Sequence, residues 1–174
     1  MSKLVKIVYL HGLESGPNGS KVGYLKNLGC NVLHPPMKYR DEDCFEKTLD
    51  LIKWYKPDFI VGSSMGGYFA YLYGKHLKLP VLLLNPALHS RSFEPKVVLP
   101  ENDRDSKVYL ITGKNDDVID PKRTEKWLNE NDKWDWNPNN HYSFDHGHRT
   151  PVMSLVNFFI THPYFGDKIL NTHL

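Results

Sequence analysis

The 174-residue chain has only two cysteines, Cys30 and Cys44, and they are not spaced as a C-x-x-C pair. Two cysteines are too few for the disulfide framework of a small secreted domain. Cysteine is often a small buried apolar residue, and we interpret Cys44 in this way. The cysteine content therefore indicates a chain that works in a reducing compartment.

The chain also lacks long apolar runs and clusters of one charge. Its formal net charge is +2 and it has no run of lysines or arginines, which argues against a nucleic-acid partner. No apolar segment approaches the roughly 20 residues that span a membrane, and residues 1–6 contain lysines rather than a signal-peptide core. With 40% hydrophobic and 24% charged residues, the composition is that of an ordinary globular protein. We expect one cytoplasmic domain over residues 1–174.

Apolar and amphipathic segments alternate along the chain. Short apolar runs predict strands at 4–10, 31–34, 58–63, 80–85, 107–112 and, from an alternating pattern, 134–136. Helical periodicity and capping residues predict helices at 20–28, 41–56, 64–77, 121–131 and 150–161. Residues 86–106 have no clear period and are interpreted as an irregular insertion. This alternation is typical of an α/β domain with a mostly parallel sheet and helices on both faces.

The segment from Gly62 to Gly66 matches the pattern G-x-S-x-G, which α/β-hydrolases use to present a nucleophilic serine. The serine must occupy a tight, strained turn between a strand and a helix, where larger residues at the two glycine positions would clash. A strand is predicted before this segment and a helix after it, as the motif requires. Ser64 is therefore a candidate nucleophile.

Further candidate residues follow other predicted strands, at the edge where parallel sheets bind ligands. The loop 11–13 is placed to supply one oxyanion-hole amide, from Leu13, and Met65 follows the serine and supplies the second. Aspartates lie in 113–119 and histidines in 141–148. The order serine, aspartate, histidine is the order that α/β-hydrolases use, and a serine hydroxyl needs such a base and orienting carboxylate to react at neutral pH.

Three blocks together carry a family resemblance, namely Tyr9–Pro17, Val61–Tyr68 and Leu84–Ala87. They resemble the YqiA-like family of small bacterial α/β-hydrolase esterases. The resemblance implies a compact α/β-hydrolase fold, and we predict a minimal form of it without a large lid, with six strands in the order 2-1-3-4-5-6. It also implies a Ser-His-Asp triad and esterase activity on simple acyl esters, without a metal or organic cofactor. We expect a thioester carbonyl to be a target as well.

Residue by residue, Ser64 matches the family nucleophile. Asp116 matches the acid, because the family pattern of glycine, aspartate and two apolar residues aligns with Gly113, Asp116, Val118 and Ile119. Asp117 is the neighbouring alternative.

Three histidines compete for the position of the base. His148 follows a glycine just before the last predicted helix, which resembles the placement in several family members, and it is our choice. His146 follows an aspartate, as the base does in other hydrolases. His141 would be the base if the residues after 137 were an insertion. A metal site within 141–148 is a weaker interpretation, because a catalytic zinc needs three converging protein ligands.

The substrate is expected to contact His11 and Gly12 in the first loop, and Arg91 in the insertion could bind an anionic group. Because the insertion is short where larger hydrolases carry a lid, we expect an open site suited to small acyl groups. The same residues are compatible with an acyltransferase or amidase, or with a hydrolase-fold protein that binds a ligand without turnover. The sequence does not predict an oligomeric state.

Overall fold

The computed structural model describes residues 4–98, 107–132 and 137–163 of the chain. Within these ranges six strands form one sheet, in which every neighbouring pair is parallel. The strands are β1 (Lys6–Leu10), β2 (Asn31–Leu33), β3 (Phe59–Ser63), β4 (Val81–Leu84), β5 (Val108–Gly113) and β6 (His141–Phe144). Their order across the sheet is β2-β1-β3-β4-β5-β6, which confirms the predicted topology.

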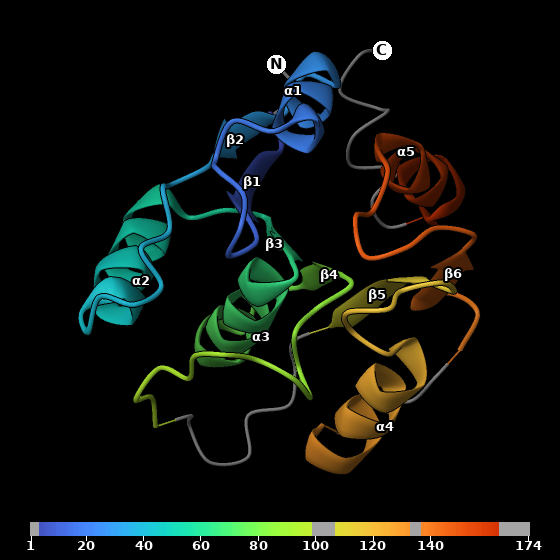
Figure 1. The fold of residues 1–174 in the computed structure, drawn as a ribbon. Helices are drawn as coiled ribbons and strands as arrows, with labels where there is room; N and C mark the ends of the chain where they lie inside the picture. The colour runs from blue at the N-terminus through green and yellow to red at the C-terminus, as the bar shows by residue number, and fades with distance from the viewer. Residues whose placement is uncertain (1–3, 99–106, 133–136, 164–174) are drawn as a thin grey trace.

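Helices cover both faces of this sheet (Figure 1). They are α1 (Ser20–Asn27), α2 (Cys44–Tyr55), α3 (Met65–Leu77), α4 (Pro121–Asn131) and α5 (Val152–Thr161). Buried side chains of α1 and α5 join one apolar cluster, and those of α2, α3 and α4 join the other. The predicted three-layer α/β architecture is therefore confirmed.

The central strands are mostly apolar because neighbouring residues point into different helical layers, both of which are buried. In β3, Ile60 belongs to the cluster with α2 and α3, whereas Phe59 and Val61 belong to the cluster with α1 and α5. All three side chains are fully buried. This explains why the strands read as continuous apolar runs rather than alternating ones.

The register of the central strands brings several chain segments together at the carboxyl edge. Leu10 pairs with Gly62, and Ser63 pairs with Leu84. On the next pair of strands, Gly113 lies opposite Phe144. The loops after β1, β3, β4, β5 and β6 therefore start side by side, at the edge where sheets of this type bind ligands.

One strand lies elsewhere than expected. The sixth strand is β6 at His141–Phe144, whereas the sequence suggested a strand at 134–136, which lies outside the described residues. The expected insertion after β4 is irregular over 86–98, which contain neither helix nor strand; its remaining positions, 99–106, are also outside the described ranges.

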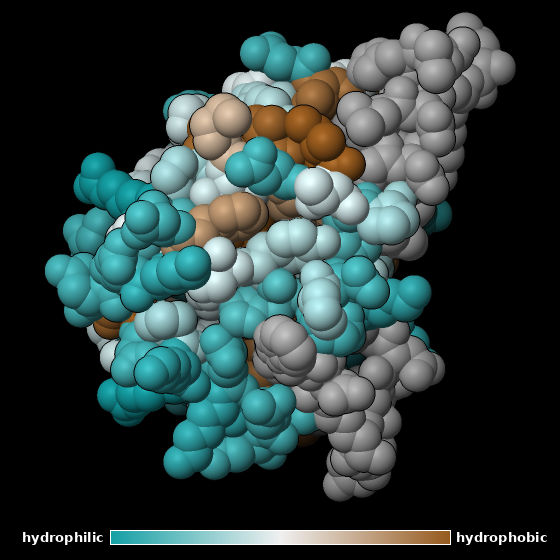
Figure 2. Space-filling model, turned by 90° about the vertical axis from the view of Figure 1, so that its right-hand side faces the viewer, coloured by the Kyte–Doolittle hydropathy of each residue, from teal (hydrophilic) through white to brown (hydrophobic). Residues whose placement is uncertain are grey.

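The surface is largely hydrophilic on the side that Figure 2 turns toward the viewer, with one apolar area near the top. In α5, Met153 and Ile160 are large apolar side chains with 63% and 62% of their surface exposed. None of the helices in the described ranges has the length and hydropathy needed to cross a membrane.

Candidate active site

Ser64 occupies the sharp turn between β3 and α3. Its backbone has φ of 53° and ψ of −116°, so it lies at positive φ, where residues other than glycine are uncommon. Backbone strain of this kind gathers at functional sites because the surrounding structure must hold it in place. The strand, strained turn and helix required by the G-x-S-x-G motif are all present.

The two glycines of the motif are needed because backbone lies directly against them. A Cβ on Gly62 would overlap the carbonyl group of Gly66 and lie 2.7 Å from the Cβ of Ala70. A Cβ on Gly66 would overlap the carbonyl oxygen of Leu10 and lie 2.5 Å from that of His11. The close approach of α3 to β3 therefore requires glycine at position 62, and its close approach to the end of β1 requires glycine at position 66.

Replacing Gly66 by alanine is expected to lower the free energy of unfolding by about 3 kcal/mol, because the atoms in the way are backbone of β1 and its loop. The matched control is Gly23→Ala in α1, where an added Cβ meets nothing within 4 Å. That change is expected to raise the free energy of unfolding by roughly 0.5 to 1 kcal/mol. Chemical denaturation of both variants measures the difference, and equal stabilities would contradict the steric argument.

Ser64, His148 and Asp116 form one hydrogen-bonded chain. His148 Nε2 lies 3.0 Å from Ser64 Oγ, and His148 Nδ1 lies 2.9 Å from Asp116 Oδ2. The carboxylate is 1% exposed and the imidazole 23%. Since a buried carboxylate accepts hydrogen bonds, the pattern assigns the proton to Nδ1 and leaves Nε2 to accept from the serine hydroxyl.

Asp116 is itself held by the backbone of its loop. Its Oδ1 accepts hydrogen bonds from the N–H groups of Val118 at 2.9 Å and Ile119 at 2.8 Å. These two bonds orient the carboxylate so that Oδ2 faces His148. Asp117, the neighbouring candidate, is exposed.

The other two candidate histidines have different partners. His141 Nε2 lies 2.9 Å from Thr112 Oγ1, and burial lowers the pKa of this imidazole. His146 Nδ1 lies 2.7 Å from the carbonyl oxygen of Gly147. Of the three histidines, His148 is the one whose ring lies between Ser64 and an acidic side chain.

The loop after β1 lies against Ser64, and the side chain of His11 fixes its backbone by hydrogen bonds. A Cβ on Gly12 would be 3.4 Å from the Cβ of Ser64. His11 is 5% exposed; its Nε2 accepts from the N–H of Met37 at 2.9 Å, and its Nδ1 donates to the carbonyl of Gly12 at 2.7 Å. Both ring nitrogens are bound to backbone, so His11 shapes the loop rather than offering a free nitrogen to a substrate.

The two expected oxyanion-hole amides come from the elements beside Ser64. Met65 is the first residue of α3, where backbone N–H groups have no partner within the helix. Leu13 follows Gly12 in the loop after β1 and packs partly against the apolar cluster of α2 and α3. The N-terminus of a helix also favours a developing negative charge.

Arg91 is engaged within the loop that follows β4. Its guanidinium lies over the ring of Tyr68, 4.1 Å from the centroid, and pairs with Glu94 at 2.7 Å. The hydrogen bond from Arg91 lowers the pKa of the Glu94 carboxyl, while burial raises the pKa of Tyr68 to about 12. A substrate anion would have to compete with Glu94 for this arginine.

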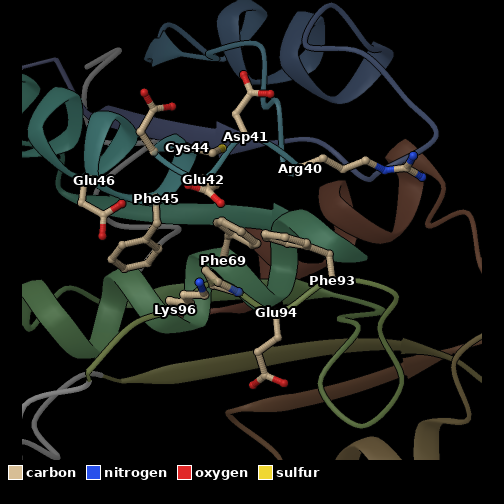
Figure 3. Close-up of a pocket in the computed structure, with 12 residues that line it drawn as sticks. Arg40, Asp41, Glu42, Cys44, Phe45, Glu46, Phe69, Phe93, Glu94 and Lys96 are labelled. Carbon is tan, nitrogen blue, oxygen red and sulfur yellow. The ribbon is translucent and has the colours of Figure 1, made fainter.

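A pocket of about 530 Å³ lies between the N-terminus of α2 and the loop after β4 (Figure 3). Residues 40–46 and 93–96 line it together with Phe69 of α3. Figure 3 shows the rings of Phe45, Phe69 and Phe93 in a row across the middle of the view, with acidic side chains of the same lining around them. Ser64 is not among its lining residues.

Across the described ranges, no group of three or more histidine, cysteine or acidic side chains is arranged to hold a metal ion.

Sequence reasoning assigned no role to Asn85, which follows β4. The residue is 2% exposed and has φ of 41°, and its side chain bonds to the last residue of β5 and to the loop after β6. The sequence feature that could have indicated its role is a polar residue at the end of an uninterrupted apolar strand, directly before a proline.

The parallel sheet, the strained serine turn and the strand-end loops define the class of this protein as an α/β-hydrolase fold. The chain belongs to the uncharacterised protein family UPF0227, whose family model matches residues 6–103, more than half of its length. This confirms the resemblance to the YqiA-like family.

Solved structures with the same fold include proteins from several bacteria. One from Xanthomonas campestris, described as a hydrolase of the α/β superfamily, is 18% identical with a TM-score of 0.62, and the match covers 87% of this chain and 91% of that one. The ydeN gene product of B. subtilis is 15% identical with a TM-score of 0.65, covering 89% and 98%. The esterase domain of a Rhodothermus marinus protein is 12% identical with a TM-score of 0.58, covering 94% and 86%.

Proposed function

We propose that this protein is a serine hydrolase that cleaves small carboxylic esters or thioesters through an acyl-enzyme. The observation that carries the proposal is the hydrogen-bonded chain from Ser64 Oγ through the His148 ring to the buried Asp116 carboxylate. The family membership and the fold shared with an esterase domain support it.

In the first half of the reaction, Ser64 Oγ attacks the carbonyl carbon while His148 Nε2 takes the hydroxyl proton. Asp116 accepts the Nδ1 hydrogen bond and stabilises the imidazolium that forms. The N–H groups of Met65 and Leu13 stabilise the tetrahedral oxyanion. His148 then gives its proton to the departing alcohol or thiol as the carbonyl reforms, which leaves the acyl group on Ser64.

In the second half, water replaces the leaving group. The water oxygen attacks the acyl carbon while His148 Nε2 accepts a proton from the water. His148 then returns that proton to Ser64 Oγ as the bond between Ser64 and the acyl group breaks. The products are a carboxylic acid and the free enzyme. We expect an open site that suits small acyl groups, because the described part of the insertion after β4, 86–98, contains neither a helix nor a strand that could act as a lid.

A fluorophosphonate probe tests the proposal directly, because it phosphonylates a serine that is activated by a histidine. The wild-type protein is expected to take up one equivalent of probe, and peptide mass spectrometry should locate it on Ser64. Ser64→Ala should take up none, while Ser63→Ala, one position away, should be labelled. A folded wild-type protein that remains unlabelled would overturn the hydrolase proposal in favour of a binding function.

A further inference from the structure

Asn85 ends β4 in a conformation that few residue types adopt. Its φ of 41° lies in the left-handed region, which asparagine, aspartate and glycine tolerate better than other residues. Its backbone N–H donates to the carbonyl of Ile111 in β5 at 2.9 Å, so the main chain stays in register with the next strand. The turn at this point directs the buried amide side chain sideways, across the carboxyl ends of β5 and β6.

Every hydrogen-bonding group of this amide is used. Its Oδ1 accepts from the N–H of Gly113 at 2.7 Å, and its Nδ2 donates to the carbonyls of Gly147 at 3.0 Å and His148 at 2.7 Å. Gly113 is the last residue of β5, directly before the loop that carries Asp116, and His148 is the histidine that contacts Ser64. One side chain therefore holds the backbone where the Asp116 loop starts and within the His148 loop.

The residues around Asn85 also hold the serine turn. The N–H of Ser64 donates to the carbonyl of Leu84 at 3.0 Å, and the N–H of Ala87 donates to the carbonyl of Ser64 at 3.0 Å. The segment 84–87 thus contacts the loop of each residue in the Ser64, His148 and Asp116 chain. Asn85 is the member of this segment whose side chain reaches two of those loops.

We propose that Asn85 is a positioning residue that holds the loops of Asp116 and His148 in register with Ser64. The proposal rests on the hydrolase function and adds a fourth residue that acts through the other three. Displacement of a reacting group by about 1 Å can cost about 100-fold in rate. A side chain that fixes two loops at once therefore has a direct effect on the geometry at Ser64.

Two substitutions of Asn85 distinguish the effect of its side-chain hydrogen bonds from the effect of its positive φ. In Asn85→Asp one oxygen still accepts from Gly113, but the other faces the carbonyl oxygens of Gly147 and His148, which accept and cannot donate. Asn85→Gly removes all three bonds and tolerates positive φ without strain. The matched control is Thr112→Val, which removes the partly buried hydrogen bond between Thr112 and His141 at the end of β5 and leaves the contacts of the His148 loop in place.

The test measures fluorophosphonate labelling in two ways, as the rate constant and as the fraction labelled at saturation. For Asn85→Asp and Asn85→Gly we expect a rate constant about 10- to 100-fold below wild type, with the saturating fraction equal to the folded fraction seen by circular dichroism. Thr112→Val should label at the wild-type rate even if it melts at lower temperature.

The alternatives have distinct signatures. Wild-type rate constants in the folded Asn85 variants, or a reduced labelled fraction with an unchanged rate constant, would overturn the positioning role and leave the hydrolase function standing. A wild-type protein that takes no probe would overturn the hydrolase function and this role with it.

Discussion

Replacing His148 by alanine is expected to lower kcat for ester hydrolysis by about 10⁵- to 10⁶-fold, with the fold retained. His148 Nε2 is 3.0 Å from Ser64 Oγ, and no other histidine has a hydrogen bond to that oxygen among the described residues. Without the imidazole the serine hydroxyl stays protonated and is a poor nucleophile at neutral pH. Steady-state kinetics with a short-chain chromogenic ester measures the loss.

The matched controls are His146→Ala and His141→Ala, which remove the two histidines that also competed for this role in the sequence. Both variants should keep kcat within a few-fold of wild type per folded molecule. His141→Ala should lose some stability, because the imidazole side chain is 7% exposed and contacts Thr112. A severe loss of kcat in His146→Ala with near-normal turnover in His148→Ala would show that the base has been misassigned.

Asp116→Asn is expected to lower kcat by about 10⁴-fold, and the reason is the tautomer of His148. The N–H groups of Val118 and Ile119 point at the Oδ1 position, so the carbonyl oxygen of an introduced asparagine takes that place. Its NH₂ group then stands where Oδ2 was, 2.9 Å from His148 Nδ1, and donates to that nitrogen. The imidazole proton moves to Nε2, which faces Ser64 and can no longer accept.

This result has a near-isosteric control one residue away. Asp117 is exposed, so Asp117→Asn should retain wild-type kcat and KM. For Asp116→Asn we expect the loss in kcat with little change in KM, because the side chain is buried behind the histidine. If the Asp117 variant lost activity and the Asp116 variant did not, the acid would have to be reassigned.

The topology could be predicted from the sequence because each buried strand is a continuous apolar run, with polar or turn-forming residues on both sides. The exception is β6, at one edge of the sheet, where none of the four residues is fully buried. Its sequence, His-Tyr-Ser-Phe, mixes polar and aromatic residues and gives little apolar signal. The alternating residues at 134–136 have a stronger strand pattern, and for this reason the sixth strand was predicted there.

The candidate site was predictable to the extent that it depends on local backbone. Ser64 follows from two glycines whose space is taken by neighbouring backbone, and those glycines are visible in the sequence. The choice of histidine depends on how the chain turns after β6, and that turn is fixed by Asn85 more than 60 positions earlier. The residue pattern within one short segment does not predict a hydrogen bond between residues that lie more than 60 positions apart in the sequence.

The hydrogen bond between Ser64 and His148 joins residues 84 positions apart, and the histidine follows the last strand of the sheet. During synthesis the N-terminal part of a chain is made first, and contacts of long sequence separation form only after the cost in loop-closure entropy is met. Until β6 docks beside β5, Ser64 has no base and its hydroxyl is as unreactive as that of an ordinary serine. In the proposed mechanism, Ser64 gains its base only when the segment after β6 is in place, so a chain that ends before His148 is not expected to react with esters.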